Sequence, residues 1–247
     1  MSPAISPDGR FVTFASKATV TCDNRSECDP ASPANHRVTS IYVRDTHTDV
    51  TIRVIRSHTG GEGDGPSYHP SISADGRHVA FVSEAANWTR GPRPRAAQVY
   101  VHDRLTGTTE LVSRRPDGRP ADGPSRFPAI SGDGTVVTFQ SLASNLVCMK
   151  RCTEGSRDIN LVWDVFVFDR RSRTMTHASR DEPEEWMAPS HGPSLDHAGR
   201  VLAYSSRHPI NQDDVEDDDD LYIWSSRRSP LIAVPSRLNL RDAPRSP

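Results

Sequence analysis

Five side chains that could do chemistry stand in a short repeated frame. Segments 65–70, 123–128 and 188–193 read Gly-Pro-Ser-Tyr-His-Pro, Gly-Pro-Ser-Arg-Phe-Pro and Ala-Pro-Ser-His-Gly-Pro. The two variable positions of the frame supply Tyr68, His69, Arg126, Phe127 and His191. An imidazole exchanges protons near neutral pH, and a guanidinium binds anions through paired hydrogen bonds. The set predicts an anion- or sugar-binding site or an acid–base site. The alternative is that these loop positions vary freely and face solvent.

The serine of the frame is present in every copy, as Ser67, Ser125 and Ser190. A catalytic nucleophile acts once in a site and does not need three copies. We therefore interpret these hydroxyls as parts of a turn rather than as nucleophiles.

A longer repeat must position these residues, because each frame leads into one. Segments 3–16, 70–83 and 128–141 follow the pattern Pro-x-Ile-Ser-x-Asp-Gly-x-x-Val-x-Phe-x-Ser, and segment 193–206 is a fourth, more divergent copy. Asp-Gly is typical of a tight hairpin turn, and the alternation after it predicts a half-buried strand.

Two further strands complete each repeat. Third strands are predicted at 41–45, 99–103, 165–169 and 221–225, and fourth strands at 51–56, 109–114, 174–180 and 231–234. Asp45, Asp103 and Asp169 end three of the third strands and are expected to cap the following turns. Four antiparallel strands, repeated four times, predict an all-β chain folded as a β-propeller with four four-stranded blades.

The repeat resembles the WD40-like propeller repeat of TolB-type proteins, in its long-loop bacterial subgroup, over nearly the whole chain. This resemblance implies a propeller that binds proteins or glycans and that is often exported. It implies no catalytic residues, since propellers host unrelated functions. Blade four departs from the pattern, with Asp196-His-Ala-Gly199 at the turn and Ser225 after the third strand, which predicts a looser turn.

The repeat sets the expected domain limits. Residues 1–235 form the propeller, with blades at about 1–57, 58–115, 116–181 and 182–235, and residues 236–247 form a disordered tail. No strand is left over to clasp a ring shut. We favour a closed four-bladed ring, while an arc completed by a second copy and a piece of a longer protein remain open. A monomer or a homodimer is therefore expected.

Composition excludes some partners. A net charge of −2 in 247 residues gives no general attraction to nucleic acid or to an anionic membrane. No apolar run approaches the roughly 18 residues that a membrane span needs. The first residues lack the apolar segment of a secretory signal.

The four cysteines occur as two local pairs in corresponding loops. Cys22–Cys28 and Cys148–Cys152 are predicted disulfides, which slightly favours an exported or cell-surface protein. Four reduced cysteines remain the alternative, and a zinc site fits poorly because the spacings depart from C-x2-C.

The predicted site lies on the face with the long loops. Loops at 17–40, 84–98, 142–164 and 207–220 share that face with loops 57–69, 115–127 and 181–192. Loops of this length are typically functional or disordered. Trp88 and Trp186 lie there as candidate ligand contacts, or as plugs of the core.

An acidic run in the last long loop raises the question of calcium. Carboxylates are the oxygen ligands that Ca²⁺ takes, and the candidates are Asp213, Asp214, Asp217 and Asp219. The run lacks the order of a known calcium loop, so a solvated acidic loop is the preferred interpretation. No cofactor is expected.

Two hypotheses about function follow. The first is a binding module that recognises a protein, peptide or glycan on the long-loop face, with no nucleic acid and no membrane insertion. The second is a lyase or hydrolase in which His69 and His191 transfer protons and Tyr68 and Arg126 act as acid or anion clamp. An enzyme would need the two imidazoles to reach one substrate atom or water.

Overall fold

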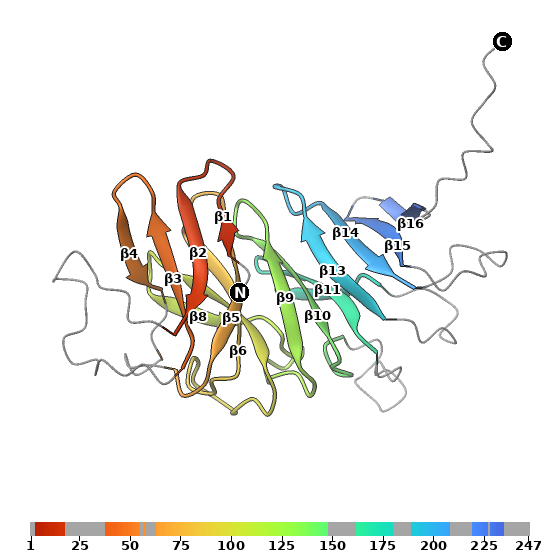
Figure 1. Cartoon of the computed structure of the whole chain (residues 1–247). Coiled ribbons are helices and arrows are strands. Elements are labelled where there is room, and N and C mark those ends of the chain that lie inside the picture. Colours follow the sequence, from red (N-terminus) through yellow and green to blue (C-terminus); the bar gives the residue numbers. More distant parts are fainter. Residues whose placement is uncertain are drawn as a thin grey trace, which may run out of the picture.

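The computed structural model describes residues 3–17, 38–54, 57, 63–147, 162–179, 189–207, 219–226 and 228–234. In these residues the chain forms four antiparallel sheets of four strands, and Figure 1 shows them side by side in chain order. The strands of every sheet also follow chain order. This is the arrangement of β-propeller blades, and it confirms the predicted all-β class.

The strands of each blade are as follows. Blade 1 has β1 (Ala4–Ile5), β2 (Phe11–Ser16), β3 (Ser40–Asp45) and β4 (Val50–Arg53). Blade 2 has β5 (Ser67–Ile72), β6 (His78–Ser83), β7 (Gln98–Asp103) and β8 (Thr108–Leu111). Blade 3 has β9 (Ser125–Ile130), β10 (Val136–Ser141), β11 (Asp164–Asp169) and β12 (Thr174–His177). Blade 4 has β13 (Ser190–Leu195), β14 (Val201–Ser206), β15 (Asp220–Ser225) and β16 (Arg228–Val234).

The Asp-Gly hairpins form as the sequence predicts. In blade 2 the Ser73 hydroxyl donates to Asp75 Oδ1 at 2.6 Å and accepts the backbone N–H of His78. Gly76 takes a positive φ of 70°, a conformation that costs a residue without Cβ little. Blades 1 and 3 repeat the Ser–Asp bond with Ser6 and Ser131.

Blade 4 does not have the looser turn that its sequence predicts. Asp196 stands where the other blades have serine, and its carboxylate accepts the N–H groups of Arg200 and Val201. Gly199 donates to the Asp196 carbonyl at 3.0 Å, as Gly76 does to Ser73. One carboxylate therefore takes over the acceptor role of the serine hydroxyl.

The aspartates that end the third strands cap the next turn, as predicted. Asp103 Oδ1 accepts the N–H groups of Leu105 and Thr106, and Asp169 Oδ1 accepts those of Arg171 and Ser172. Arg77 also donates two hydrogen bonds to the Asp103 carboxylate, at 2.9 and 2.7 Å. This contact holds the pKa of Asp103 well below its usual range.

The core lies between successive blades rather than within one. In blades 2, 3 and 4 an aromatic residue of the second strand stacks on one of the third: Phe81 on Tyr100, Phe139 on Phe166, and Tyr204 on Tyr222. These pairs face the preceding blade, whose small and branched side chains fill the space opposite. Each interface thus joins an aromatic face to an aliphatic one.

The inner strands and their turns also join successive blades. Ala74 N–H donates to the Gly132 carbonyl, and Gly132 N–H donates to the His197 carbonyl. A Cβ at Gly132 would collide with the His197 ring, so a larger residue here would have to displace that ring. The hairpin turns of blades 2, 3 and 4 therefore form one hydrogen-bonded line.

The described part of the chain forms an arc and not the closed ring that the sequence analysis favoured. The extensive contacts all join a blade to its successor, and Figure 1 places blades 1 and 4 at opposite ends of the row. Strand patterns fix each blade, whereas closure depends on the angles between blades.

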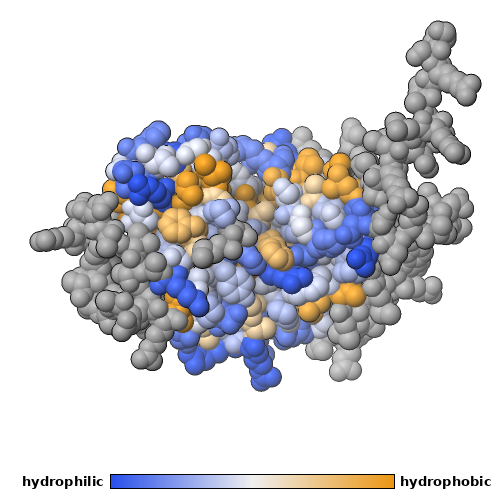
Figure 2. Space-filling model, viewed as in Figure 1, coloured by the Kyte–Doolittle hydropathy of each residue, from blue (hydrophilic) through white to orange (hydrophobic). Residues whose placement is uncertain are grey.

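The described surface mixes apolar and hydrophilic side chains (Figure 2). Among the described residues there is no helix long and apolar enough to cross a membrane. Figure 2 shows apolar patches interspersed with hydrophilic side chains. Within the described ranges, the exposed large hydrophobic residues are Ile5, Leu105, Phe127, Val201 and Leu221.

Candidate functional site

The three repeated frames form the beginnings of the inner strands β5, β9 and β13, and each has the same irregularity. β5, β9 and β13 shift register against their neighbours just after the first two residues. At the shift His69 and Phe127 have φ of 49° and 51°, and Gly192 occupies the equivalent place in blade 4 with 66°. Residues other than glycine rarely adopt a positive φ. Blades 2 and 3 thus keep two rings in a strained backbone position.

The strained residues meet across the boundary between blades 2 and 3. The His69 and Phe127 rings stack with centroids 4.5 Å apart, and Tyr68 meets His69 edge-on at 5.1 Å. His69 Nδ1 is buried with no hydrogen-bond partner among the described residues. Burial lowers the pKa of His69, with the charge of Arg126 acting in the same direction. The neutral imidazole is therefore favoured.

Arg126 extends this group toward blade 3's third strand. Its guanidinium carbon lies 5.1 Å from the Phe127 ring centroid and 3.6 Å from that of Trp163. Its Nε is buried without a partner, and no carboxylate of the described residues pairs with it. Burial lowers its pKa. Stacking on two rings leaves the edge of the guanidinium available for an anion.

We call Tyr68, His69, Arg126, Phe127 and Trp163 the mouth cluster. Four of its members were predicted from the sequence. Trp163 was missed, although its place directly before β11 matches that of Ala97 before β7 and Asp219 before β15. Comparing those positions between repeats would have singled it out.

Tyr68 is anchored at the edge of the cluster. Its hydroxyl donates to Glu84 Oε1 at 3.2 Å. Burial, together with the charge of Glu84, raises the pKa of Tyr68 to about 12. The phenol is therefore a hydrogen-bonding group and a poor proton donor at neutral pH.

His191 forms a separate group. Its Nε2 lies 3.1 Å from Asp219 Oδ2, and Asp219 Oδ1 accepts a bond from Arg207 Nε at 3.3 Å. The side chain of His191 is 41% exposed. Among the described residues no contact joins His191 to His69. A carboxylate that orients an imidazole is one half of a general-base arrangement.

The repeated serines are structural, though in a different way from the turn role expected. Ser67, Ser125 and Ser190 pair their hydroxyls with Ser83, Ser141 and Ser206 at 2.9 Å. Their own N–H groups donate to the carbonyls of Thr39, Ala97 and Trp163 in the blade before. Each serine therefore links two strands of one blade and the residue that precedes the third strand of its neighbour.

Trp88 is not a surface contact. It is only 4% exposed, its ring meets Phe81 edge-on, and its Nε1 donates to Ser83 Oγ at 2.7 Å. The aromatic residue fills the end of the blade 1–blade 2 core because a buried hydroxyl satisfies its one donor. Trp186 lies outside the described residues, as do Cys22, Cys28, Cys148 and Cys152.

No metal centre is assembled in the described part of the chain. No group of three or more His, Cys, Asp or Glu side chains is arranged there to hold an ion. Of the calcium candidates, Asp213, Asp214 and Asp217 lie outside the described residues. Both oxygens of Asp219 are engaged by His191 and Arg207.

Comparisons with known proteins bear on the fold. No protein-family model matches the sequence, and no curated protein does. A TolB structure from Agrobacterium tumefaciens superposes with a TM-score of 0.52 at 14% identity, covering 93% of this chain and 62% of that one. A prolyl endopeptidase structure gives 0.51 at 12%, covering 95% and 28%. The propeller domain of the trilobed protease from Pyrococcus furiosus gives 0.48 at 13%, covering 95% and 56%.

The similarities to the TolB and prolyl endopeptidase structures show the fold. The chain has a β-propeller fold like that of the TolB structure, as its repeat predicted. It spans less than two thirds of the length of each of these structures.

Proposed function

We propose that this TolB-like propeller is a binding module, and that its mouth cluster takes a peptide or protein segment bearing a carboxylate. The observation that carries the proposal is the pair of rings held at positive φ where blade 4 has glycine. A strained position of this kind costs of order 1 kcal/mol and is typical of functional sites.

Exposure of Phe127 supports an aromatic contact for the ligand. Phe127 is 40% exposed, although one face of its ring stacks on His69. Covering it with a ligand would remove apolar surface from water, at roughly 25 cal/mol for each Å².

Arg126 supports the carboxylate. It is partly buried, its guanidinium carbon lies 3.6 Å from the centroid of the Trp163 ring, and it lacks an anionic partner among the described residues. Charge-assisted hydrogen bonds to a guanidinium are about twice as strong as neutral ones. A ligand carboxylate would supply the missing partner.

A selection experiment tests the proposal. Wild-type protein is used to enrich binders from a phage-displayed random peptide library, and the enriched peptides are synthesised and titrated. We expect acidic peptides whose affinity falls about tenfold or more in Arg126→Gln, because a charged hydrogen bond is lost. Arg119→Gln, which removes an exposed arginine from the 115–120 turn, is the matched control and should bind normally.

Phe127→Gly separates binding from folding. Glycine relaxes the φ of 51° at this position, so the midpoint of unfolding should stay or rise while affinity for the same peptides falls. Peptides that bind Arg126→Gln and Phe127→Gly as well as wild type would overturn the proposal, as would a library with no enriched sequence.

A second candidate rests on His191 and Asp219. Their 3.1 Å contact would orient the imidazole as a general base in a hydrolase or lyase. Hydrolysis of 4-nitrophenyl acetate that is lost in His191→Ala and kept in His197→Ala would support it. Equal rates in the two variants would remove it.

A further inference from the structure

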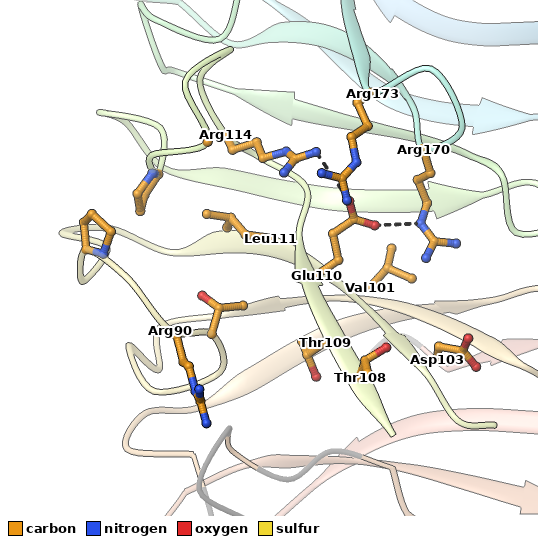
Figure 3. A pocket seen from close by; sticks show the side chains of 14 residues that line it. Arg90, Val101, Asp103, Thr108, Thr109, Glu110, Leu111, Arg114, Arg170 and Arg173 are labelled. Atoms are coloured by element: carbon orange, nitrogen blue, oxygen red, sulfur yellow. Dashed lines mark hydrogen bonds and ion pairs between the residues drawn. The ribbon is translucent and has the colours of Figure 1, made fainter. Parts of the chain in front are cut away.

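A cavity lies on the outer side of blade 2, away from the inner strands. Its volume is about 410 Å³, and it is bounded by β8 and by the turn between β11 and β12. Figure 3 shows arginines reaching toward it from both blades. The cationic lining residues are Arg90, Arg114, Arg170 and Arg173.

Glu110 organises two of these arginines. Arg170 Nε lies 3.1 Å from Glu110 Oε2, and Arg114 Nη2 lies 3.4 Å from Oε1 (Figure 3). Both arginine side chains are 17% exposed. One carboxylate thus holds two guanidinium groups in place but cancels only one of their charges.

The remaining charges are also positive. Arg173 and Arg90 are exposed and form no ion pair within the described ranges. Asp103, the other carboxylate of the lining, is bound by Arg77 through two bonds. The cavity lining therefore carries four guanidinium groups, and Glu110 is the one lining carboxylate that is not already paired with an arginine outside the cavity.

The backbone at Arg173 is a second, independent observation. Arg173 has a φ of 60° at the turn position where blade 2 has Gly107 and blade 1 has Asp49. Glycine and aspartate tolerate this conformation, whereas arginine is disfavoured there. The turn thus carries a cation over the cavity at a cost that the neighbouring turns avoid.

We propose that this arginine cavity binds a small molecule carrying phosphate, sulfate or carboxylate groups. The volume lies in the range of small-molecule sites, roughly 300 to 1,000 Å³. Preordered guanidinium groups bind tetrahedral and planar oxyanions through paired bonds. Thr108 and Thr109 add hydroxyl groups to the lining. The site is separate from the mouth cluster and does not rest on the function proposed for it.

Calorimetric titration with pyrophosphate, sulfate and citrate, in low-salt buffer, tests the inference. Arg173→Asn removes the charge and keeps a residue that tolerates positive φ. Arg171→Gln is the control, because Arg171 lies on the same turn, is 75% exposed and pairs with Asp133 outside the cavity. At least one anion should bind wild type and Arg171→Gln alike, and bind Arg173→Asn about tenfold more weakly or worse.

Amide chemical shifts locate the site. The bound anion should shift the signals of residues 108–111 and 170–173 in wild type. The three anions distinguish phosphate, sulfate and carboxylate as the preferred group. Equal weakening in both variants would show general charge attraction instead of a site, and no binding by any of the three anions would also overturn the inference.

Discussion

The interior of the arc and its ends use the same repeat positions in different ways. Ile41, Val99 and Val165, at one position of blades 1 to 3, are fully buried, whereas Leu221 at that position of blade 4 is 42% exposed. Phe81 and Phe139 are fully buried against the preceding blade, whereas Phe14 in blade 1 is only partly buried.

The difference shows that a blade draws its stability from its neighbours. Hydrophobic side chains stabilise in proportion to the apolar area removed from water. Identical positions therefore differ in energy according to whether another blade covers them. The repeat pattern gives each blade an apolar face, and that face becomes part of a hydrophobic core only where a neighbouring blade packs on it.

The largest expected effect compares two phenylalanines. Phe139→Ala should lower the free energy of unfolding by about 3–5 kcal/mol, because a fully buried ring is removed from the interface of blades 2 and 3. Phe14→Ala, at the same repeat position, should cost about 1 kcal/mol. Urea denaturation measures both. Equal losses would break the comparison.

The second prediction concerns the Arg77–Asp103 contact, which blade 4 lacks because Ser225 replaces the aspartate. Asp103→Asn should cost about 1.5–3 kcal/mol at pH 7, since a charged hydrogen bond is lost. The folded-state pKa values of Asp103 and Asp45 are lowered, that of Asp45 to about 2 by Arg10.

The pH dependence of that contact follows from the sign of the shift. A lowered folded pKa gives stability that is complete above the unfolded value of about 3.9 and is lost as pH falls below it. Wild type should lose stability more steeply than Asp103→Asn between about pH 4 and pH 2. Parallel curves from acid denaturation would contradict the assignment.

The third prediction concerns the His69–Phe127 stack between blades 2 and 3. The folded pKa of His69 is lowered by burial, so the unfolded chain binds the proton more readily. Stability should be complete above about pH 6.5 and fall as pH drops through that value. His69→Asn should flatten this dependence between pH 7.5 and 5.5. An NMR titration that places the pKa of His69 at or above 6.5 would contradict it.

The smallest effect is a gain at the end of the arc. Ser225→Asp places a carboxylate opposite Arg200, as Asp103 stands opposite Arg77. An exposed pair of this kind is worth about 0–1 kcal/mol. The thermal midpoint should rise slightly in Ser225→Asp and stay unchanged in Ser225→Asn. A fall in the aspartate variant alone would show that blade 4 cannot form this contact.

The sequence was sufficient for most features that repeat within a blade, although the looser turn predicted for blade 4 does not form. Ser-x-Asp-Gly specified the hairpins, and the Gly-Pro-Ser frame placed Tyr68 and His69 beside Arg126 and Phe127. These contacts depend on residues close in the chain or at matching repeat positions.

Features that depend on one blade's angle to the next could not be predicted, and the described residues form an arc for this reason. For Trp88 the sequence left a ligand contact and a core plug open, and the structure shows the core position, where Ser83 accepts its N–H group. The arginine cavity joins Glu110 to Arg170, 60 residues apart, and no repeat marks that pair. The bounds of the fourth strands were also longer in prediction than in the structure for blades 1 to 3.

The line of hydrogen bonds from Ala74 through Gly132 to His197 has a consequence for unfolding. Extensive contacts join only successive blades, so the described structure resembles a short one-dimensional chain of coupled units. Each end unit is held from one side, and each inner unit from two. Amide protons of β14 and β15 should exchange with solvent sooner than those of β6 and β10, because local unfolding should begin in the end blades and proceed inward.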